Sequence, residues 1–375
     1  MRAADLAARS AAPVLSAARP VETVASLDLL RLMAALLVVL FHFGYYAALD
    51  RDPAGLFGIL GQNLRFEALM PYAEAGWVGV YVFFVISGFV IAMSAQGKSP
   101  AQFAIGRVTR IWPALVVFAT LALIAVLIRT PLPSGESLAR WVRALLLSPQ
   151  GPWIDGAIWT LTVEAVFYGL ICLLIATLGV GRLPQVARMV ALASALFWLV
   201  VMGGAATGIA AAYWAKVTLL TTGAFFALGI LFYDGHRAGW TAARVMWCGV
   251  AMAASAAALA QFAQDNGLNA DGQAVLLWAG LIVLGIVMTG AERRWRPGAG
   301  MRMLARRLGL MTYPLYLVHQ ISGGFVVWLL LQAGLGAGAA VSVMVGVILL
   351  VSYGFTLWIE PPLRRGLQVG LQRWA

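Results

Sequence analysis

Runs of apolar residues separated by short polar connections extend along almost the whole chain. Ten of these runs are close to the roughly 20 residues that an α-helix needs to cross a bilayer. They lie near residues 27–48, 76–95, 111–129, 157–179, 186–203, 213–233, 245–263, 274–290, 313–332 and 337–359. The pattern predicts an all-α, polytopic membrane protein with about ten transmembrane helices.

The composition excludes a soluble globular protein, and the charge pattern predicts an orientation. Of the 375 residues, 62% are apolar and 11% are charged, and the mean hydropathy is +0.87. One set of alternate connections carries 19 of the 26 Lys and Arg residues, whereas the other set carries six. Positive residues favour the cytoplasmic side, so both termini are predicted to be cytoplasmic. The net charge of +11 therefore reflects topology, and we expect membrane lipids as partners and no nucleic acid.

The chain is predicted to form one membrane domain with short tails. We expect a flexible cytoplasmic tail over 1–25, a transmembrane domain over 26–366 and a cytoplasmic tail over 367–375. The outward connection 130–156 contains four prolines and is predicted to include an interfacial or re-entrant helix. The basic cytoplasmic connection 291–312 is predicted to contain a short amphipathic helix.

Two ionisable residues in the first span are the leading candidates for chemistry. Arg31 and His42 are eleven residues apart, so a helix separates them by about 16 Å and places them on one face. An ionisable side chain at membrane depth is costly and by default marks a functional site. An ion pair with Asp28 is the alternative role for Arg31. For His42 the alternative is a core histidine that bonds another helix.

The second span and the basic segment after it contain two further features. Ser87 and Gly88 interrupt a bulky apolar sequence, which favours close helix packing over a functional role. In the segment FAIGRVTRIWP, Arg107 and Arg110 lie three residues apart and share a helix face. Their partner is either an anionic lipid headgroup or the phosphate of a cofactor.

The fourth span begins with polar residues at helical spacing. Thr160, Glu164 and Tyr168 recur every four residues and therefore lie on one face. A carboxylate at this depth requires a partner. A histidine or arginine of another helix, or water in a cavity, would satisfy it.

Polar side chains also mark the last two spans. Thr312, Tyr316 and His319 form one stripe in the ninth span, either as a functional group or as interfacial belt residues. Glu360 ends the tenth span and is expected to pair with a cytoplasmic arginine. The two prolines after Glu360 are expected to stop the helix.

Several common catalytic motifs are absent from the sequence. It contains no phosphate-binding GxxxxGK[ST] loop, no HExxH or paired CxxC for zinc and no GxSxG nucleophile elbow. With three histidines in total, we expect no metal site. The remaining candidates are a buried base, a carboxylate and cytoplasmic arginines. This set fits group transfer from a phosphorylated, water-soluble donor to an acceptor within the membrane.

Six short motifs follow one another between about residues 26 and 366. They are Asp28, Arg31 and His42; GVYVFFVISGF; Phe103, Arg107, Arg110, Ile111 and Pro113; Trp159, Thr160, Leu161, Glu164, Phe167 and Tyr168; Thr312, Tyr313, Leu315, Tyr316, Leu317 and His319; and Glu360 and Pro362. In this order they resemble the acyltransferase 3 family of integral-membrane acyltransferases. The chain departs from the family pattern at Tyr81, where members often carry an acidic residue. It also departs at Pro314, which is expected to kink or start the ninth span.

The resemblance implies transfer of an acyl group, most often acetyl, from coenzyme A to a hydroxyl group. Acyl-CoA is then a donor substrate, and no permanently bound cofactor is expected. The implied acceptor is a sugar, a lipid-linked glycan or another molecule of the cell envelope. The implied location is the cytoplasmic membrane of a bacterium.

The residues suggest roles in such a reaction. Arg31, Arg107 and Arg110 are expected to bind the phosphates of the donor, and His42 is expected to act as general base. Glu164 is expected to orient or support His42, and a covalent acyl-histidine stays open. Residues expected to support the site or line the substrates are Asp28, Ser87, Trp159, Tyr168, Tyr316, His319 and Glu360.

Two other functions are compatible with the same residues. In a proton-coupled transporter or exporter, His42, Glu164 and His319 would form a relay. In a non-catalytic membrane scaffold, substitution of His42 would leave acyl modification unchanged. The oligomeric state and the position acylated stay open.

Overall fold

All regular elements of the structure are helices. The structure is a computed structural model that describes residues 24–204, 215, 218–268, 271–295 and 297–373, and these residues contain no strand. The expected tail over 1–25 lies almost wholly outside them. The α-helices are α1 (Ala25–Phe41), α2 (Ala47–Leu49), α3 (Leu56–Leu60), α4 (Met70–Ala73), α5 (Gly79–Ser94), α6 (Pro100–Arg129), α7 (Ser134–Leu145), α8 (Trp159–Thr177), α9 (Leu183–Met202), α11 (Gly223–Ala238), α12 (Ala242–Asp265), α13 (Asp271–Trp295), α14 (Ala299–Val318), α15 (Ile321–Gln332), α16 (Ala337–Gly354) and α17 (Glu360–Gln372).

Short helices of other types join several of these elements. The 3-10 helices are η3 (Glu74–Val78), η4 (Gly156–Ile158) and η5 (Val180–Arg182), and the π-helices are η2 (His42–Tyr46) and η6 (Phe355–Ile359). Because η2 follows α1 directly, the first span ends in a wider helical turn. This turn begins at His42.

The predicted membrane architecture is confirmed. Within the described residues, eight helices are long and apolar enough to cross a membrane, and the bent pair α14 and α15 makes a ninth. The predicted span 213–233 begins partly outside the described residues and continues as α11, which has 16 residues. With α11 included, helices occupy all ten predicted runs. The protein is therefore an integral membrane protein, and the regular elements of its described residues are all helices.

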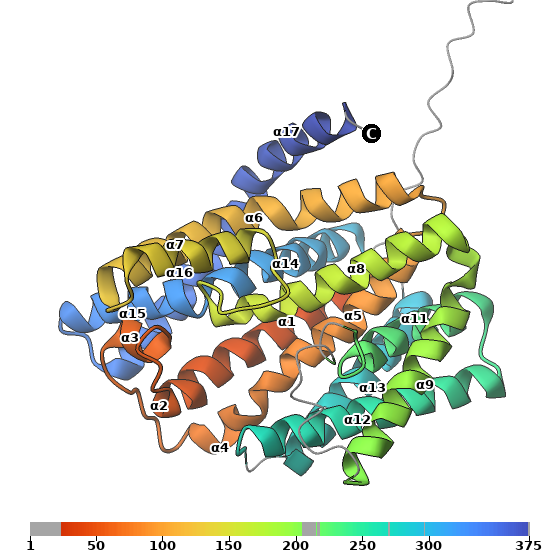
Figure 1. The fold of residues 1–375 in the computed structure, drawn as a ribbon, viewed down its shortest axis with the longest axis horizontal. Helices are drawn as coiled ribbons and strands as arrows, with labels where there is room; N and C mark the ends of the chain where they lie inside the picture. Colours follow the sequence, from red (N-terminus) through yellow and green to blue (C-terminus); the bar gives the residue numbers. More distant parts are fainter. Residues whose placement is uncertain (1–23, 205–214, 216–217, 269–270, 296, 374–375) are drawn as a thin grey trace, which may run out of the picture.

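Two predicted helix boundaries are wrong, both at prolines. Pro361 and Pro362 do not stop the last helix, because they occupy the first turn of α17, where no intrahelical N–H bond is lost. The chain continues through η6 into α17, which projects from the bundle and covers most of the expected tail 367–375 (Figure 1). Pro314 lies inside α14, whereas the 71° bend falls between Val318 and Ile321.

The two long connections contain the helices that were expected. The segment 130–156 contains α7, which is amphipathic and carries Glu136 and Arg143 on its polar side. The short amphipathic helix expected in 291–312 forms the first part of α14. The basic segment around Arg107 is the first half of α6, which begins at a Ser99–Gln102 capping box.

The first helix lies between two hydrophobic clusters. Leu30 and Val38 pack into a cluster formed with α5, α8, α9, α11, α12 and α13. Ala35 and Phe43 pack into a second cluster formed with α3, α6 and the α14–α16 region. Figure 1 shows α1, α5 and α8 in the middle of the bundle. The helix that carries Arg31 and His42 is therefore enclosed on opposite sides and held in place.

Glycines allow the closest helix contacts. A Cβ at Gly88 of α5 would overlap the backbone of Phe226, and one at Gly229 of α11 would overlap Val85. The close packing predicted at this pair is present at Gly88, whereas Ser87 donates a hydrogen bond to Glu164. Such contacts are common where helices associate in membranes through small residues.

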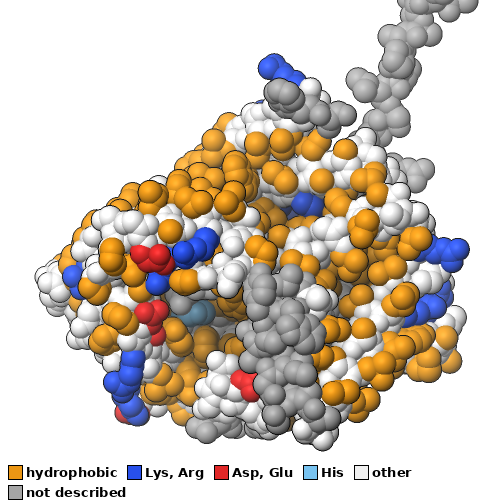
Figure 2. All heavy atoms as spheres, viewed as in Figure 1, with side chains coloured by type: hydrophobic (Ala, Val, Ile, Leu, Met, Phe, Trp, Pro, Cys, Tyr) orange, Lys and Arg blue, Asp and Glu red, His pale blue; other side chains and the backbone are white. Residues whose placement is uncertain are grey.

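The outer surface is mainly apolar. In Figure 2, hydrophobic side chains cover most of the visible face, and Lys, Arg, Asp and Glu appear in small groups, some of them beside a hollow in the face. Histidine atoms are visible inside a hollow on the same face. An apolar exterior with an interior polar site is expected of a polytopic membrane protein.

Candidate functional site

His42 is held at the turn where α1 changes into a π-helix. Its Nδ1 lies 2.9 Å from the carbonyl oxygen of Val38. A ring nitrogen beside a carbonyl oxygen must donate, so in the neutral ring Nδ1 carries the proton and Nε2 is an acceptor. Single π-helical turns often occur at functional sites. The backbone of α1 therefore presents His42 as a base through Nε2.

His319 is the direct side-chain partner of His42. It follows the last residue of α14, where the bend to α15 begins, and only 1% of its surface is exposed. Its Nδ1 donates to the carbonyl oxygen of Tyr316 at 2.7 Å, and its Nε2 lies 3.3 Å from His42 Nδ1. The Nε2 lone pair of His319 thus accepts from the same N–H of His42 that faces Val38. This contact favours the tautomer of His42 that has a free Nε2.

Asp155 fixes the start of α15 and the start of α8. Its carboxylate accepts from the backbone N–H of Ala157 at 2.8 Å and from that of Ile321 at 3.3 Å. It lies just before the span that begins at Gly156, and burial raises the pKa of Asp155 to about 6, although the two N–H groups oppose this shift. The side chain connects the bend beside His319 to η4, which leads into the start of α8.

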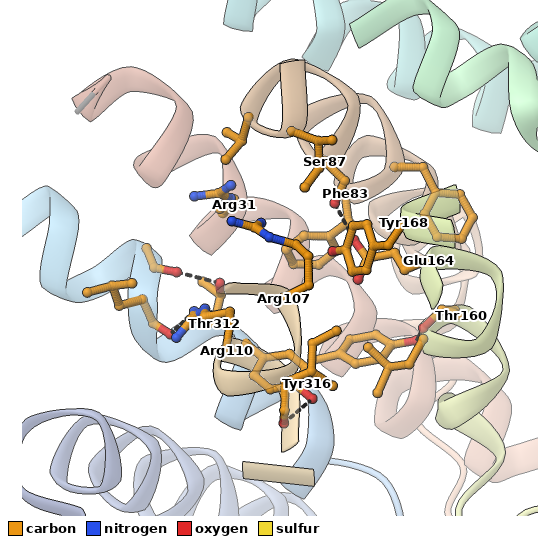
Figure 3. Close-up of a pocket in the computed structure, with 18 of the residues that line it drawn as sticks. Arg31, Phe83, Ser87, Arg107, Arg110, Thr160, Glu164, Tyr168, Thr312 and Tyr316 are labelled. Atoms are coloured by element: carbon orange, nitrogen blue, oxygen red, sulfur yellow. Dashed lines mark hydrogen bonds between the residues drawn. The ribbon is translucent and has the colours of Figure 1, made fainter. Parts of the chain in front are cut away.

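Four arginines surround a cavity of about 260 Å³ at the end of the bundle that the charge pattern assigns to the cytoplasm. We call it the arginine chamber, and its charged lining residues are Arg31, Arg107, Arg110, Arg364 and Glu164. Figure 3 shows Arg31 and Arg107 extending into the same space. Such a cluster of cations is costly unless anions neutralise it, and guanidinium groups match phosphate geometry well.

The arginines of this chamber differ in their partners. Arg31 pairs with Asp28 at 2.9 Å, and Arg110 pairs with the buried Glu360. The predicted ion pairs of Asp28 and Glu360 are therefore present. Arg107 lies over the rings of Phe103 and Tyr168, and within the described residues it forms no ion pair and its buried Nε has no partner.

Glu164 belongs to the arginine chamber. Its carboxylate accepts a hydrogen bond from Ser87, as the dashed line in Figure 3 shows. The expectation that Glu164 orients His42 is not met, because the hydrogen-bond partners of His42 within the described residues are Val38 and His319. In the relay expected for a transporter, His42 and His319 are in contact, but no hydrogen bond among the described residues joins either of them to Glu164. The carboxylate lies one helical turn after Thr160 on the same face of α8, and both residues line the arginine chamber.

A second cavity of about 210 Å³ lies beside His42. We call it the histidine chamber. Tyr316 and Val80 line both chambers and form the wall between them. The hydroxyl of Tyr316 donates to the carbonyl oxygen of Ala157 at 3.1 Å and accepts from Thr160 at 3.0 Å. Tyr316, held by the start of α8, therefore separates the arginines from the histidine together with Val80.

The structure distributes the expected site residues over these two chambers. Arg31, Ser87, Arg107, Arg110, Thr160, Glu164, Tyr168 and Tyr316 line the arginine chamber, whereas His42, Trp159 and Tyr316 line the histidine chamber. Sequence reasoning missed Arg364, Asp155, Trp77 and Gln320. Only Arg364 gave a usable signal, because it lies one helical turn beyond Glu360. The others depend on contacts between distant segments.

Comparison with known families identifies one match. A family model described as an acyltransferase domain, that of the acyltransferase 3 family, matches residues 24–359. No significant match was found among curated proteins or solved structures. The matched range includes every lining residue of both chambers except Arg364, which lies a few residues beyond it.

Proposed function

This chain belongs to the acyltransferase 3 family, and from that premise we propose that it transfers an acyl group from acyl-CoA to a hydroxyl group in the histidine chamber. Membership makes it a membrane acyltransferase. The observation that carries the finer proposal is the pair of chambers with one shared wall at Tyr316. One chamber has the cations that a phosphorylated donor needs, and the other has the base that an acceptor hydroxyl needs.

The donor is held by its phosphates in the arginine chamber. Arg107 offers a guanidinium group without an ion pair among the described residues, and Arg364 offers a second one at the mouth. Arg31 is paired with Asp28 through one guanidinium nitrogen at 2.9 Å, so its remaining N–H groups are the ones that would donate to a phosphate. The acyl end of the donor then extends along α1 past Tyr316 toward His42. Bidentate contacts with phosphate would orient the donor for this approach.

The transfer step uses the free Nε2 of His42. As the acceptor oxygen attacks the thioester carbonyl carbon, Nε2 takes the hydroxyl proton. The C–S bond then breaks, the acyl group stays on the acceptor oxygen, and the proton passes to the departing coenzyme A thiolate. His319 accepts from Nδ1 of His42, and this contact holds the ring of His42 in place while it carries the second proton.

The finer assignments complete this proposal. The acyl group is acetyl, and the acceptor is a sugar or a lipid-linked glycan of the cell envelope. The protein acts in the cytoplasmic membrane of a bacterium, with the arginine chamber facing the cytoplasm. The excess of Lys and Arg in alternate connections supports this orientation.

Radiolabelled acetyl-CoA and purified protein test the proposal. The protein is supplied with cell-envelope glycan fractions, and labelled glycan is counted for wild type, His42→Gln and Arg31→Ala. His236→Gln is the matched control, because His236 lines neither chamber. We expect a loss of at least about 100-fold for His42→Gln, the contribution typical of a general base, and wild-type activity for His236→Gln.

Two results would contradict the proposal. Full transfer by His42→Gln would exclude this residue as the base. Absence of transfer by every form, combined with solute flux into vesicles that depends on His42, would favour a transporter.

A further inference from the structure

The histidine chamber has no charged wall among the described residues. Its lining residues are Val38, Phe41, His42, Tyr46, Trp77, Val80, Tyr81, Gly156, Ala157, Trp159, Phe262, Tyr316 and Gln320. This contrasts with the arginine chamber, where four arginines and a carboxylate face the space. A charged group that entered the histidine chamber would lose its hydration without gaining an ion pair there. The lining therefore selects against charged ligands.

Two buried polar atoms of this lining have no hydrogen-bond partner in the described structure. They are Nε1 of Trp77, a donor, and Oε1 of Gln320, an acceptor. Only 4% of Trp77 and 7% of Gln320 is exposed. Unpaired buried polar groups cost free energy, and nearly all such groups in native proteins are satisfied. A ligand that accepts from Trp77 and donates to Gln320 would remove this cost.

The rest of the wall is aromatic. Trp159, Tyr46 and Tyr81 line the space together with Phe262, whose ring centroid lies 4.7 Å from that of Trp77. The hydroxyl of Tyr46 is engaged with Asp50 at 3.2 Å, so this ring presents mainly its apolar face. Ligand sites typically combine apolar and aromatic walls with a few polar groups that fix orientation. The histidine chamber has this combination beside His42.

We propose that the histidine chamber binds one uncharged, hydroxyl-bearing ring of an acceptor, with Trp77 donating to one ring oxygen and Gln320 accepting from one hydroxyl. This inference rests on the proposed function and names the acceptor class of the same site. The two contacts orient the ring so that another hydroxyl faces Nε2 of His42. Acceptor rings that carry a carboxylate, a phosphate or an ammonium group are excluded. Trp77 and Gln320 are therefore acceptor-binding residues.

Binding can be measured separately from transfer. Wild-type protein without acyl-CoA, in a detergent that lacks a sugar headgroup, is titrated with neutral methyl pyranosides of glucose, galactose and mannose. The charged probes are methyl glucuronoside, methyl glucoside 6-phosphate and methyl 2-amino-2-deoxyglucoside. Saturation-transfer NMR reports binding. We expect at least one neutral pyranoside to bind at least tenfold more tightly than its charged analogues.

Variants then test the two residues. Trp77→Phe keeps the aromatic ring and removes the N–H, and Gln320→Leu keeps the approximate volume and removes the amide. Each is expected to weaken binding of the neutral pyranoside about tenfold, the effect of one lost hydrogen bond. Trp278→Phe is the matched control, because Nε1 of Trp278 is also buried and unpaired but lies outside the chamber. This control is expected to bind like wild type.

Gln320→Glu provides a second test in a residue of nearly equal size. The new carboxylate is expected to shift preference toward the amino sugar by at least tenfold. Equal binding of neutral and charged probes, or no binding of any neutral pyranoside, would overturn the inference. So would unchanged binding in both Trp77→Phe and Gln320→Leu.

The inference and the proposed function fail in different ways. Selective binding of a neutral pyranoside without any acyl transfer would support the inference and contradict the function. Transfer of acetyl to a uronic acid or an amino sugar as efficiently as to a neutral sugar would support the function and overturn the inference.

Discussion

Arg107 gives the sharpest test of how the donor is held. Its guanidinium carbon lies 5.5 Å from the ring centroid of Phe103 and 5.9 Å from that of Tyr168, and it forms no ion pair within the described residues. Arg107→Gln therefore removes a charge that forms no ion pair among the described residues and whose internal contacts are with aromatic rings. We expect the melting temperature to change little. A hydrogen bond to a charged group contributes about 1.5–3 kcal/mol, so binding of acetyl-CoA should weaken about 10-fold to 150-fold.

Arg110 is the matched comparison, because its contacts lie within the protein. It pairs with Glu360, donates to the carbonyl oxygen of Leu310 at 3.1 Å and lies over the ring of Tyr313. Only 4% of Glu360 is exposed. Arg110→Gln would leave that carboxylate buried and unpaired, a change that typically costs about 3–5 kcal/mol. We therefore expect Arg110→Gln to lower the melting temperature markedly.

The assay separates phosphate binding from general damage. Isothermal titration in detergent measures binding of acetyl-CoA and of S-acetylpantetheine, which carries the same thioester but no phosphate. Arg107→Gln should weaken binding of acetyl-CoA and leave binding of S-acetylpantetheine unchanged. Equal weakening of both ligands, or no weakening of either, would refute the assignment of Arg107 to the donor phosphates.

Three further predictions concern the base, the bend and the helix contacts. His319→Ala removes the Nε2 atom that accepts from Nδ1 of His42, and it should lower kcat about tenfold with an unchanged KM for acetyl-CoA. An unchanged kcat in steady-state kinetics would show that His319 does not position His42. Because burial raises the pKa of Asp155 from 3.8 to about 6, the folded state retains a proton that the unfolded state loses, so stability should fall by about 3 kcal/mol as pH rises from about 3 to about 7. The stability of Asp155→Asn, measured by thermal unfolding, should lack this pH dependence. An identical change of stability with pH in wild type and variant would refute the assignment to Asp155. Gly88→Ala should destabilise by about 1–3 kcal/mol through overlap with the α11 backbone. Gly106→Ala in α6, with open space around it, should unfold at or slightly above the wild-type temperature, because alanine favours a helix over glycine.

The sequence determined the membrane character and most of the helices, because apolar run length is a local property. A bilayer requires about 20 consecutive apolar residues in a spanning helix, and that requirement can be read without knowledge of the fold. The face shared by Arg107 and Arg110 was predictable for the same reason, since helical spacing is local. The ion pair of Glu360 was predictable in kind, because a carboxylate at a basic membrane boundary requires a cation. Its partner, Arg110, was not, because 250 residues separate them.

The tertiary structure alone decided how the polar residues divide into two chambers. Glu164 and His42 were both expected at one site, yet Ser87 holds Glu164 on the arginine side and His319 bonds His42 on the other. The prediction that Pro361 and Pro362 stop a helix was wrong for a similar reason. Whether a proline ends a helix or begins one depends on the path of the chain before it, which the tertiary structure sets.

Arg31 and His42 illustrate the limit of what can be predicted from the sequence. Their spacing placed both on the inner face of one helix, but it gave no sign that Tyr316 separates them. Tyr316 reaches that position because α14 packs against α1 and because the start of α8 holds its hydroxyl. Helical periodicity is encoded by neighbours along the chain, whereas a wall between two cavities is built from segments that meet only after folding.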